Sequence, residues 1–181
     1  MLDFGCGAES PLATVGFPGH VVAVDIAWQP LLAARRRGTR AALVQADAAV
    51  LERTFRPRSV DAAVALDVVE HLPRDAALTL VAALEGVARR RVIIFTPNGF
   101  VPQPPEPDNP HQAHRSGFTV DELRALRYRV RGIHGLRCLC GPFAGSRWRP
   151  QAFWRRISDL TAPPIYLLPR LAFALFCVKD L

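Results

Sequence analysis

The most suggestive chemical feature is a glycine turn near the start of the sequence. Gly5-Cys6-Gly7 follows four residues that resemble the end of a buried strand, and Asp25 lies 20 residues beyond Gly5. In a strand–helix–strand unit, this spacing places a carboxylate at the end of the second strand, where it accepts hydrogen bonds from two ribose hydroxyls. Because glycine lets a ligand approach the backbone closely, the pattern predicts a nucleoside-containing cofactor.

The residues after the turn discriminate between cofactors. A dinucleotide fingerprint would need a third glycine at position 10, where Ser10 stands, and the adjacent Glu9 is poorly suited to a phosphate. A sulfonium cofactor with an amino-acid tail has no phosphate and carries a positive charge, so it tolerates carboxylates near the loop. The sequence therefore favours S-adenosylmethionine over NAD.

Two further acids, Asp47 and Asp67, also follow predicted strands. Ligands on parallel sheets bind outside the carboxyl ends of the strands, so we expect both acids near the cofactor. An aspartate after a strand can instead cap the next helix, and this alternative stays open for Asp25 and Asp47.

Three histidines are candidates for acid–base chemistry. Methyl transfer from a sulfonium is an in-line displacement that needs no metal, but an oxygen or nitrogen acceptor can need a base. His114 and His111 follow a proline-rich stretch, and His71 follows the strand that ends at Asp67. The alternatives are a structural role for His71 at a helix start and solvent-exposed rings for the other two.

The cysteines do not form a metal-binding pattern. Cys138 and Cys140 are separated by one residue, which is the wrong spacing for a usual zinc site, and Cys6 and Cys177 stand alone. We therefore predict free thiols, no metal site and a cytoplasmic protein.

The elements that must position these residues alternate between strands and helices. Such alternation predicts an α/β fold with a doubly wound, mostly parallel sheet. A proline-rich segment, residues 96–110, is expected to form an ordered loop over the carboxyl edge of the sheet. The predicted strands are residues 21–24, 42–44, 61–66, 92–95, 128–139 and 171–178, and the predicted helices are residues 28–37, 74–90, 119–126 and 149–160. We expect a single domain of residues 1–181, with a cofactor-binding half (1–100) and a part with the substrate loop and last strands (97–181).

The net charge of +7 comes almost wholly from arginine. A compositional bias toward arginine explains this charge without an anionic partner, although contact with a membrane surface stays open. Nucleic acid is disfavoured as a partner because no base-flipping motif follows the fourth strand, despite Arg147, Arg149, Arg155 and Arg156. The sequence predicts no transmembrane segment and makes no prediction of oligomeric state.

Five segments, in order, resemble the motifs of class I S-adenosylmethionine-dependent methyltransferases, of the small-molecule, type 11-like group. The segments are LDFGCG, VVAVDIA, VQADAAVL, SVDAAVALDVVEHLP and VIIFTPNGF, within residues 1 to about 100. The resemblance implies a Rossmann-like sheet with an antiparallel last strand and helices on both faces. It also implies methyl transfer to a small-molecule acceptor with an oxygen, nitrogen or carbon nucleophile.

The resemblance assigns roles to individual positions. Asp3 and the backbone of Gly5, Cys6 and Gly7 would hold the methionine moiety, and Asp67 would lie near it. The remaining roles concern the nucleoside: Asp25 for the ribose, Ile26 against the adenine, Asp47 at the adenine amino group and Ala48 through its backbone.

Two features depart from the family pattern. Glu9 replaces the last glycine of the loop motif, although Ser10-Pro11 can still start a helix. Family members also carry a helix before the first strand, and this sequence begins at that strand, so we expect a less covered cofactor. The alternative function is a truncated, non-catalytic methyltransferase-like binding or scaffold protein; an NAD-dependent oxidoreductase is a weaker rival.

Overall fold

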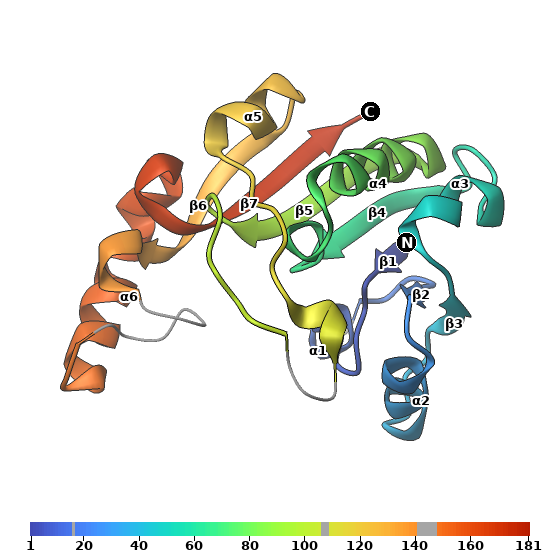
Figure 1. Cartoon of the computed structure of the whole chain (residues 1–181), viewed down its shortest axis with the longest axis horizontal. Helices are drawn as coiled ribbons and strands as arrows, with labels where there is room; N and C mark the ends of the chain where they lie inside the picture. Colours follow the sequence, from blue (N-terminus) through green and yellow to red (C-terminus); the bar gives the residue numbers. More distant parts are fainter. Residues whose placement is uncertain (16, 106–108, 141–147) are drawn as a thin grey trace. The chain divides into compact units, whose positions relative to one another are not determined.

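The computed structural model describes residues 1–15, 17–105, 109–140 and 148–181 (Figure 1). They form two compact units, which are described separately. The N-terminal unit contains residues 1–69, 75–93 and 180–181, and the C-terminal unit contains residues 70–74 and 94–179. Arg147 and residues 106–108 of the proline-rich segment lie outside the described residues, as does the side chain of Arg155.

Seven strands are hydrogen-bonded in the order β3-β2-β1-β4-β5-β7-β6. This order confirms the predicted doubly wound topology. The strands are β1 (Leu2–Phe4), β2 (Val22–Asp25), β3 (Ala42–Gln45), β4 (Val60–Leu66), β5 (Ala88–Pro97), β6 (Arg129–Leu136) and β7 (Ala172–Asp180).

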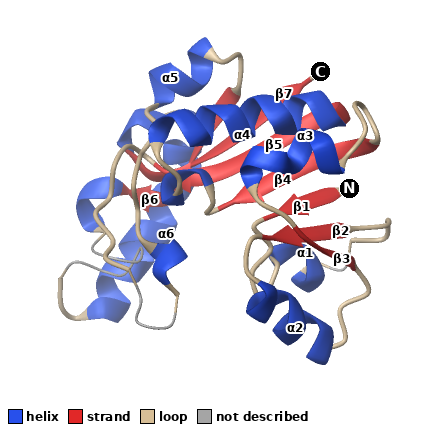
Figure 2. Ribbon diagram, turned by 45° about the vertical axis from the view of Figure 1, so that its right-hand side comes forward, coloured by secondary structure: helices blue, strands red, loops and turns tan. Residues whose placement is uncertain are grey.

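The N-terminal unit is built around β1, which pairs in parallel with both β2 and β4, while β2 pairs in parallel with β3. Leu2, Val24 and Ala63 are completely buried. Near-continuous apolar strands are typical of a parallel sheet covered on both faces. Figures 1 and 2 show α3 (Leu51–Thr54) and α4 (Arg74–Val87) together on one side of these strands, and α1 (Pro11–Thr14) and α2 (Trp28–Arg36) on the other.

The predicted C-terminal end of α4 was wrong. The helix buries one stripe, including Leu80 and Leu84, but it ends at Val87 rather than at residue 90. β5 begins at the next residue, and residues 88–90 join the sheet instead of continuing the helix. Two arginines of this strand also pair with acids of neighbouring strands: Arg89 with Asp61 (2.8 Å) and Arg91 with Asp180 (2.7 Å). Tertiary pairing therefore shortens a helix that local periodicity would extend.

The C-terminal unit contains the predicted antiparallel last strand, since β7 pairs antiparallel with β6. α5 (Val120–Ala125) begins at Thr119 with the predicted capping box. β6 ends at Leu136, earlier than predicted, because residues 137–139 form a short 3₁₀ helix. The positive φ angles of His134 and Gly135 (62° and 68°) coincide with a break in the register between β6 and β7.

α6 (Gln151–Leu167) is longer than predicted and continues through Pro163 and Pro164. Its packing on β6 explains the extension. Ile165 is buried, and a side chain at Gly132 would come within 2.5 Å of the Ile165 carbonyl oxygen. Because Gly132 has no side chain, α6 can approach β6 closely. The packing between them therefore outweighs the cost of the two prolines. Among the described residues, no helix is both long and apolar enough to cross a membrane.

Candidate functional sites

The glycine turn crosses from β1 to the end of β2. The backbone N–H groups of Gly5 and Cys6 both donate to the Val24 carbonyl, at 2.7 and 3.0 Å. Gly5 and Gly7 have φ angles of 71° and 58°, which favour glycine. A side chain at Gly5 would collide with Val68, whereas the space beside Gly7 is open. The turn thus exposes backbone at Gly7 that a ligand can approach.

Asp25 joins this turn to the end of β2. One of its carboxylate oxygens accepts from the Gly7 N–H and the other from the Ala27 N–H, each at 2.9 Å. A carboxylate offers about four lone-pair positions, so it retains capacity for two hydroxyl donors. The next residue, Ile26, is an apolar side chain that is 39% exposed. The end of β2 therefore presents a carboxylate beside an uncovered apolar surface.

A buried carboxylate also lies under the turn. The Ser10 hydroxyl donates to Asp3 and accepts from the Leu12 N–H at 3.1 Å, so Ser10 caps α1 as predicted. Burial raises the pKa of Asp3, and the negative charge of Asp25 adds to this, while the Ser10 hydrogen bond opposes it. Burial and the same two carboxylates raise the pKa of Cys6 to about 12.

Glu9, which replaces a family glycine, forms an ion pair at the surface. Its carboxylate pairs with Arg37 at 2.7 Å, and its side chain is 75% exposed. Arg37 also donates to the Ala8 carbonyl at 3.1 Å. The acidic side chain is therefore neutralised at the surface.

A cavity of about 920 Å³ borders the turn. Its lining comes from the turn, including Asp3 and Gly7, and from residues 17–21 and 37–41, which precede β2 and β3. Asp25 is not among the lining residues, but it accepts from the N–H of Gly7, which is. The cavity therefore lies beside the backbone of the turn.

The two other acids differ in their surroundings. Asp47 is exposed and accepts from the Ala49 N–H at 3.0 Å, so the helix-cap role weighed for this residue is observed. Ala48, beside it, is buried. Asp67 follows β4 with a φ angle of 51°. Aspartate tolerates this left-handed conformation better than most residues, and such conformations cluster at functional sites.

Two histidines in the C-terminal unit come together. The rings of His71 and His114 lie edge to face with centroids 4.8 Å apart. Nδ1 of His71 lies 3.3 Å from the Ala113 carbonyl oxygen, and Nδ1 of His114 lies 2.6 Å from that of Val101. Because a carbonyl only accepts, Nδ1 of each ring carries a hydrogen, and in the neutral form of each ring Nε2 carries the lone pair.

Glu70 completes this group. It is 1% exposed, and its carboxylate accepts from the Thr96 hydroxyl at 3.1 Å. One ligand atom from each of Glu70, His71 and His114 lies within 4.8 Å of the others. The Glu70 carbonyl accepts from the backbone N–H groups of Arg115 and Ser116, at 2.7 and 3.0 Å. The segment after His114 is thereby held against residues 70–71.

His111 is not part of this group. It is exposed, and its backbone N–H donates to the Asn109 side chain at 3.1 Å.

Burial and the neighbouring His114 lower the pKa of His71, although hydrogen bonding to the Ala113 carbonyl opposes this. His71 is therefore a neutral imidazole at neutral pH, with its Nε2 lone pair available.

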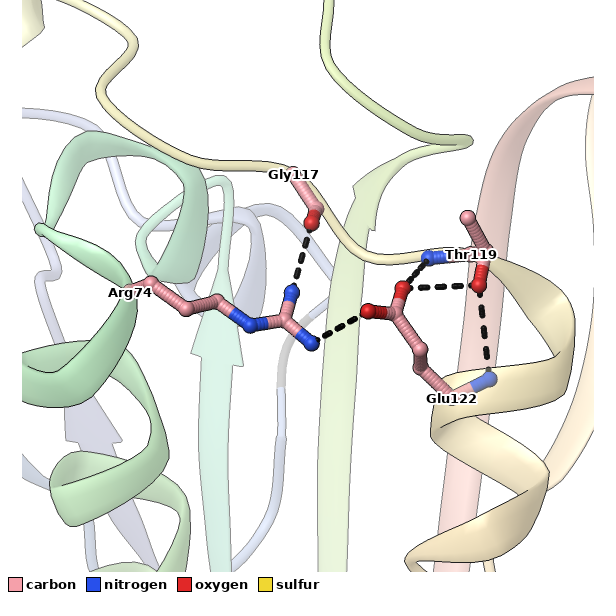
Figure 3. A network of polar contacts seen from close by, with 4 residues as sticks. All are labelled: Arg74, Gly117, Thr119 and Glu122. Carbon is pink, nitrogen blue, oxygen red and sulfur yellow. Dashed lines mark hydrogen bonds and ion pairs between the residues drawn. The ribbon is translucent and has the colours of Figure 1, made fainter.

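Arg74 fixes the same segment further along (Figure 3). Its guanidinium donates to the Gly117 carbonyl at 2.7 Å and pairs with Glu122 at 2.6 Å. Glu122 in turn accepts from the backbone N–H and the hydroxyl of Thr119, both at 2.7 Å. The guanidinium also lies 4.0 Å from the centre of the Phe118 ring. One arginine thus ties residues 117–122 to the start of α4.

A family model described as a methyltransferase domain matches residues 2–95. The chain belongs to this methyltransferase family. The match covers every segment quoted above up to Phe95, so the resemblance seen in the sequence is confirmed. No curated protein matches the sequence significantly.

Solved structures share the fold of the methyltransferase domain over 99% of this chain. A SAM-dependent methyltransferase from Archaeoglobus fulgidus is 17% identical, with a TM-score of 0.63 over 85% of that chain. The methyltransferase domain of a bacterial Hen1 (CtHen1-CN) is 19% identical, with a TM-score of 0.57 over 89% of that chain. Magnesium protoporphyrin IX methyltransferase (ChlM) from Synechocystis PCC 6803, solved with bound SAM, is 17% identical, with a TM-score of 0.53 over 68% of that chain.

The structure of this methyltransferase family member differs from the sequence-based grouping in one respect. The sequence grouped His111 with His114, whereas the fold brings His114 to His71 and leaves His111 at the surface. Sequence reasoning also missed Glu70 as a site residue. The signal was present, since Glu70 directly precedes His71, but only the fold shows that both meet a histidine 43 residues later.

Proposed function

We propose that this family member transfers a methyl group from S-adenosylmethionine to a small-molecule acceptor. The observation that carries the proposal is the Asp25 carboxylate, which is tied to the Gly7 and Ala27 N–H groups at 2.9 Å. These bonds orient the carboxylate and leave it capacity for two ribose hydroxyls. The SAM dependence or bound SAM of the structural neighbours supports the choice of cofactor.

The residues of the N-terminal unit fit this cofactor. Open backbone at Gly7 and the buried Asp3 would hold the methionine moiety, with Gly5 and Cys6 shaping the turn. The exposed Ile26 would be covered by the adenine. The adenine amino group would meet Asp47 and the Ala48 backbone, and Asp67 would lie near the methionine end. When bound, S-adenosylmethionine supplies an activated methyl group on a sulfonium.

The chemistry left to the chain is alignment and, for an acceptor that bears a proton, deprotonation. The acceptor's lone pair forms the new bond to the methyl carbon while the electron pair of the carbon–sulfur bond moves to sulfur. We assign the acceptor side to His114 and His71. In its neutral form each ring offers an Nε2 lone pair, so His114 can take the acceptor's proton. Such a base contributes about 10²- to 10⁴-fold in rate.

Calorimetry tests the proposal. S-adenosylmethionine or S-adenosylhomocysteine should bind the purified chain, and NAD should not. Asp25→Ala should weaken binding by about 5- to 150-fold, as expected for loss of charged hydrogen bonds worth about 1–3 kcal/mol. The matched control is Asp61→Asn, which removes an exposed carboxylate of β4 in the same unit. Unchanged affinity of a folded Asp25→Ala variant would remove the ribose assignment.

A further inference from the structure

We propose that Glu70, His71 and His114 form a binding site for a divalent transition-metal ion. The three side chains come from two separate stretches of the C-terminal unit, and one ligand atom from each lies within 4.8 Å of the others. Two imidazoles and one carboxylate are a common donor set for such ions in proteins.

The orientation of the two imidazoles supports the site. Metal-bound histidines usually donate their second ring N–H to a backbone carbonyl or a carboxylate, which fixes the ring and the tautomer. His71 and His114 already do this through Nδ1, to the carbonyls of Ala113 and Val101. With Nδ1 of each ring engaged in this way, Nε2 is the ring nitrogen left for an ion.

The carboxylate adds a second argument. Glu70 is 1% exposed, and a buried carboxylate is costly unless positive charge or hydrogen bonds compensate it. Its carboxylate accepts from the Thr96 hydroxyl at 3.1 Å and lies beside the two histidine rings. A cation between the three side chains would place positive charge beside this carboxylate and stabilise its ionised form.

The donor set and the spacing define the ion. Nitrogen ligands favour zinc and similar transition ions over magnesium or calcium, which prefer oxygen. Ligands about 2.0–2.2 Å from a tetrahedral zinc ion lie roughly 3.3–3.6 Å apart, so the side chains need to close by about 1 Å. Three protein ligands leave at least one position open, as in catalytic rather than structural sites.

The open position would take an oxygen or nitrogen atom of the methyl acceptor. With the ion bound, both Nε2 lone pairs would be occupied, so His114 would not act as the base. Coordination would instead lower the pKa of the acceptor, and its proton would pass to solvent water. This last step rests on the proposed function. Binding of the ion does not, since it is measured on the chain without S-adenosylmethionine or acceptor.

The experiment titrates the untagged, EDTA-treated full chain with Zn²⁺ in competition with a chromophoric chelator. One equivalent should bind. His71→Ala and His114→Ala should each weaken Zn²⁺ by about 100-fold or more, since loss of a supporting residue alone costs 10–100-fold. Co²⁺ should give the visible spectrum of a low-coordinate nitrogen–oxygen site without a thiolate charge-transfer band.

Two controls separate this site from the alternatives. His111→Ala removes an exposed histidine from the same loop and should leave Zn²⁺ affinity unchanged. Replacing Cys138 and Cys140 by serine should also leave it unchanged. Retained affinity in a folded His114→Ala variant, loss of affinity in the cysteine variant, or no stoichiometric binding would each overturn the proposal. Circular dichroism verifies that each variant is folded.

Discussion

Arg74 gives a sharp test of how the segment after His114 is held. Its guanidinium contacts three groups: the Gly117 carbonyl at 2.7 Å, Glu122 at 2.6 Å and the Phe118 ring at 4.0 Å (Figure 3). Arg74→Ala removes all three contacts at once. We expect it to lower the free energy of unfolding, because alanine offers neither the positive charge nor the forked set of donors.

The magnitude follows from the surroundings of each contact. A charge-assisted hydrogen bond to the Gly117 carbonyl contributes about 1.5–3 kcal/mol. The pair with Glu122 contributes only about 0.2–1 kcal/mol, because both side chains are more than a third exposed (36% and 43%). The contact with Phe118 adds roughly 0.5–1 kcal/mol. The expected loss for Arg74→Ala is therefore about 2–5 kcal/mol.

Urea unfolding at neutral pH, followed by circular dichroism and fluorescence together, measures this loss. Arg74→Lys keeps the charge without the fork and should fall between the parent and Arg74→Ala. The control is Arg90→Ala, whose side chain is 82% exposed and lies 4.0 Å from Asp61; it should stay within about 0.5 kcal/mol of the parent. An Arg74→Ala variant within the same margin would refute the reasoning.

The Glu122 contact also predicts a pH dependence. Partial burial raises the pKa of Glu122, but hydrogen bonds from Thr119 and the charge of Arg74 outweigh this and hold it below its usual value of 4.5. A carboxylate with a lowered folded pKa stabilises the protein above its unfolded pKa and loses that effect as pH falls through the folded value. The difference between parent and Arg74→Ala should therefore narrow in acid, without vanishing, because the Gly117 bond remains.

Two further predictions concern the glycine turn. Gly5→Ala should sharply reduce the melting temperature, because it adds a collision to a left-handed residue, whereas Gly7→Ala should cost only about 1–2 kcal/mol of backbone strain; equal melting temperatures would contradict this. Burial and two neighbouring carboxylates raise the pKa of Cys6 to about 12, so iodoacetamide at mildly alkaline pH should label the exposed Cys138 first. Peptide mapping over time measures the order of labelling.

Local signals in the sequence determined most of the fold. The apolar runs that form β2, β3 and β4 predicted a parallel sheet, because strands covered on both faces are near-continuously apolar. Burial on both faces, which was predicted for each run, does not hold for β3, because it lies at the sheet edge and is only partly buried. Thr119 and Glu122 predicted the start of α5, because a capping box is complete within four residues. The spacing of Gly5 and Asp25 also predicted that both lie at one strand edge, and the Gly7–Asp25 hydrogen bond shows that they do.

Only the tertiary structure decided the features that join distant segments. The sequence contains His71 and His114 as separate candidates, but no local pattern states that residues 43 apart meet edge to face beside Glu70. The length of α6 likewise depends on Gly132. Because glycine has no side chain, α6 packs closely on β6 and continues through Pro163 and Pro164, where local propensity would end it. Such contacts depend on how the chain returns on itself, and that is fixed by packing over the whole core rather than by propensities within one segment.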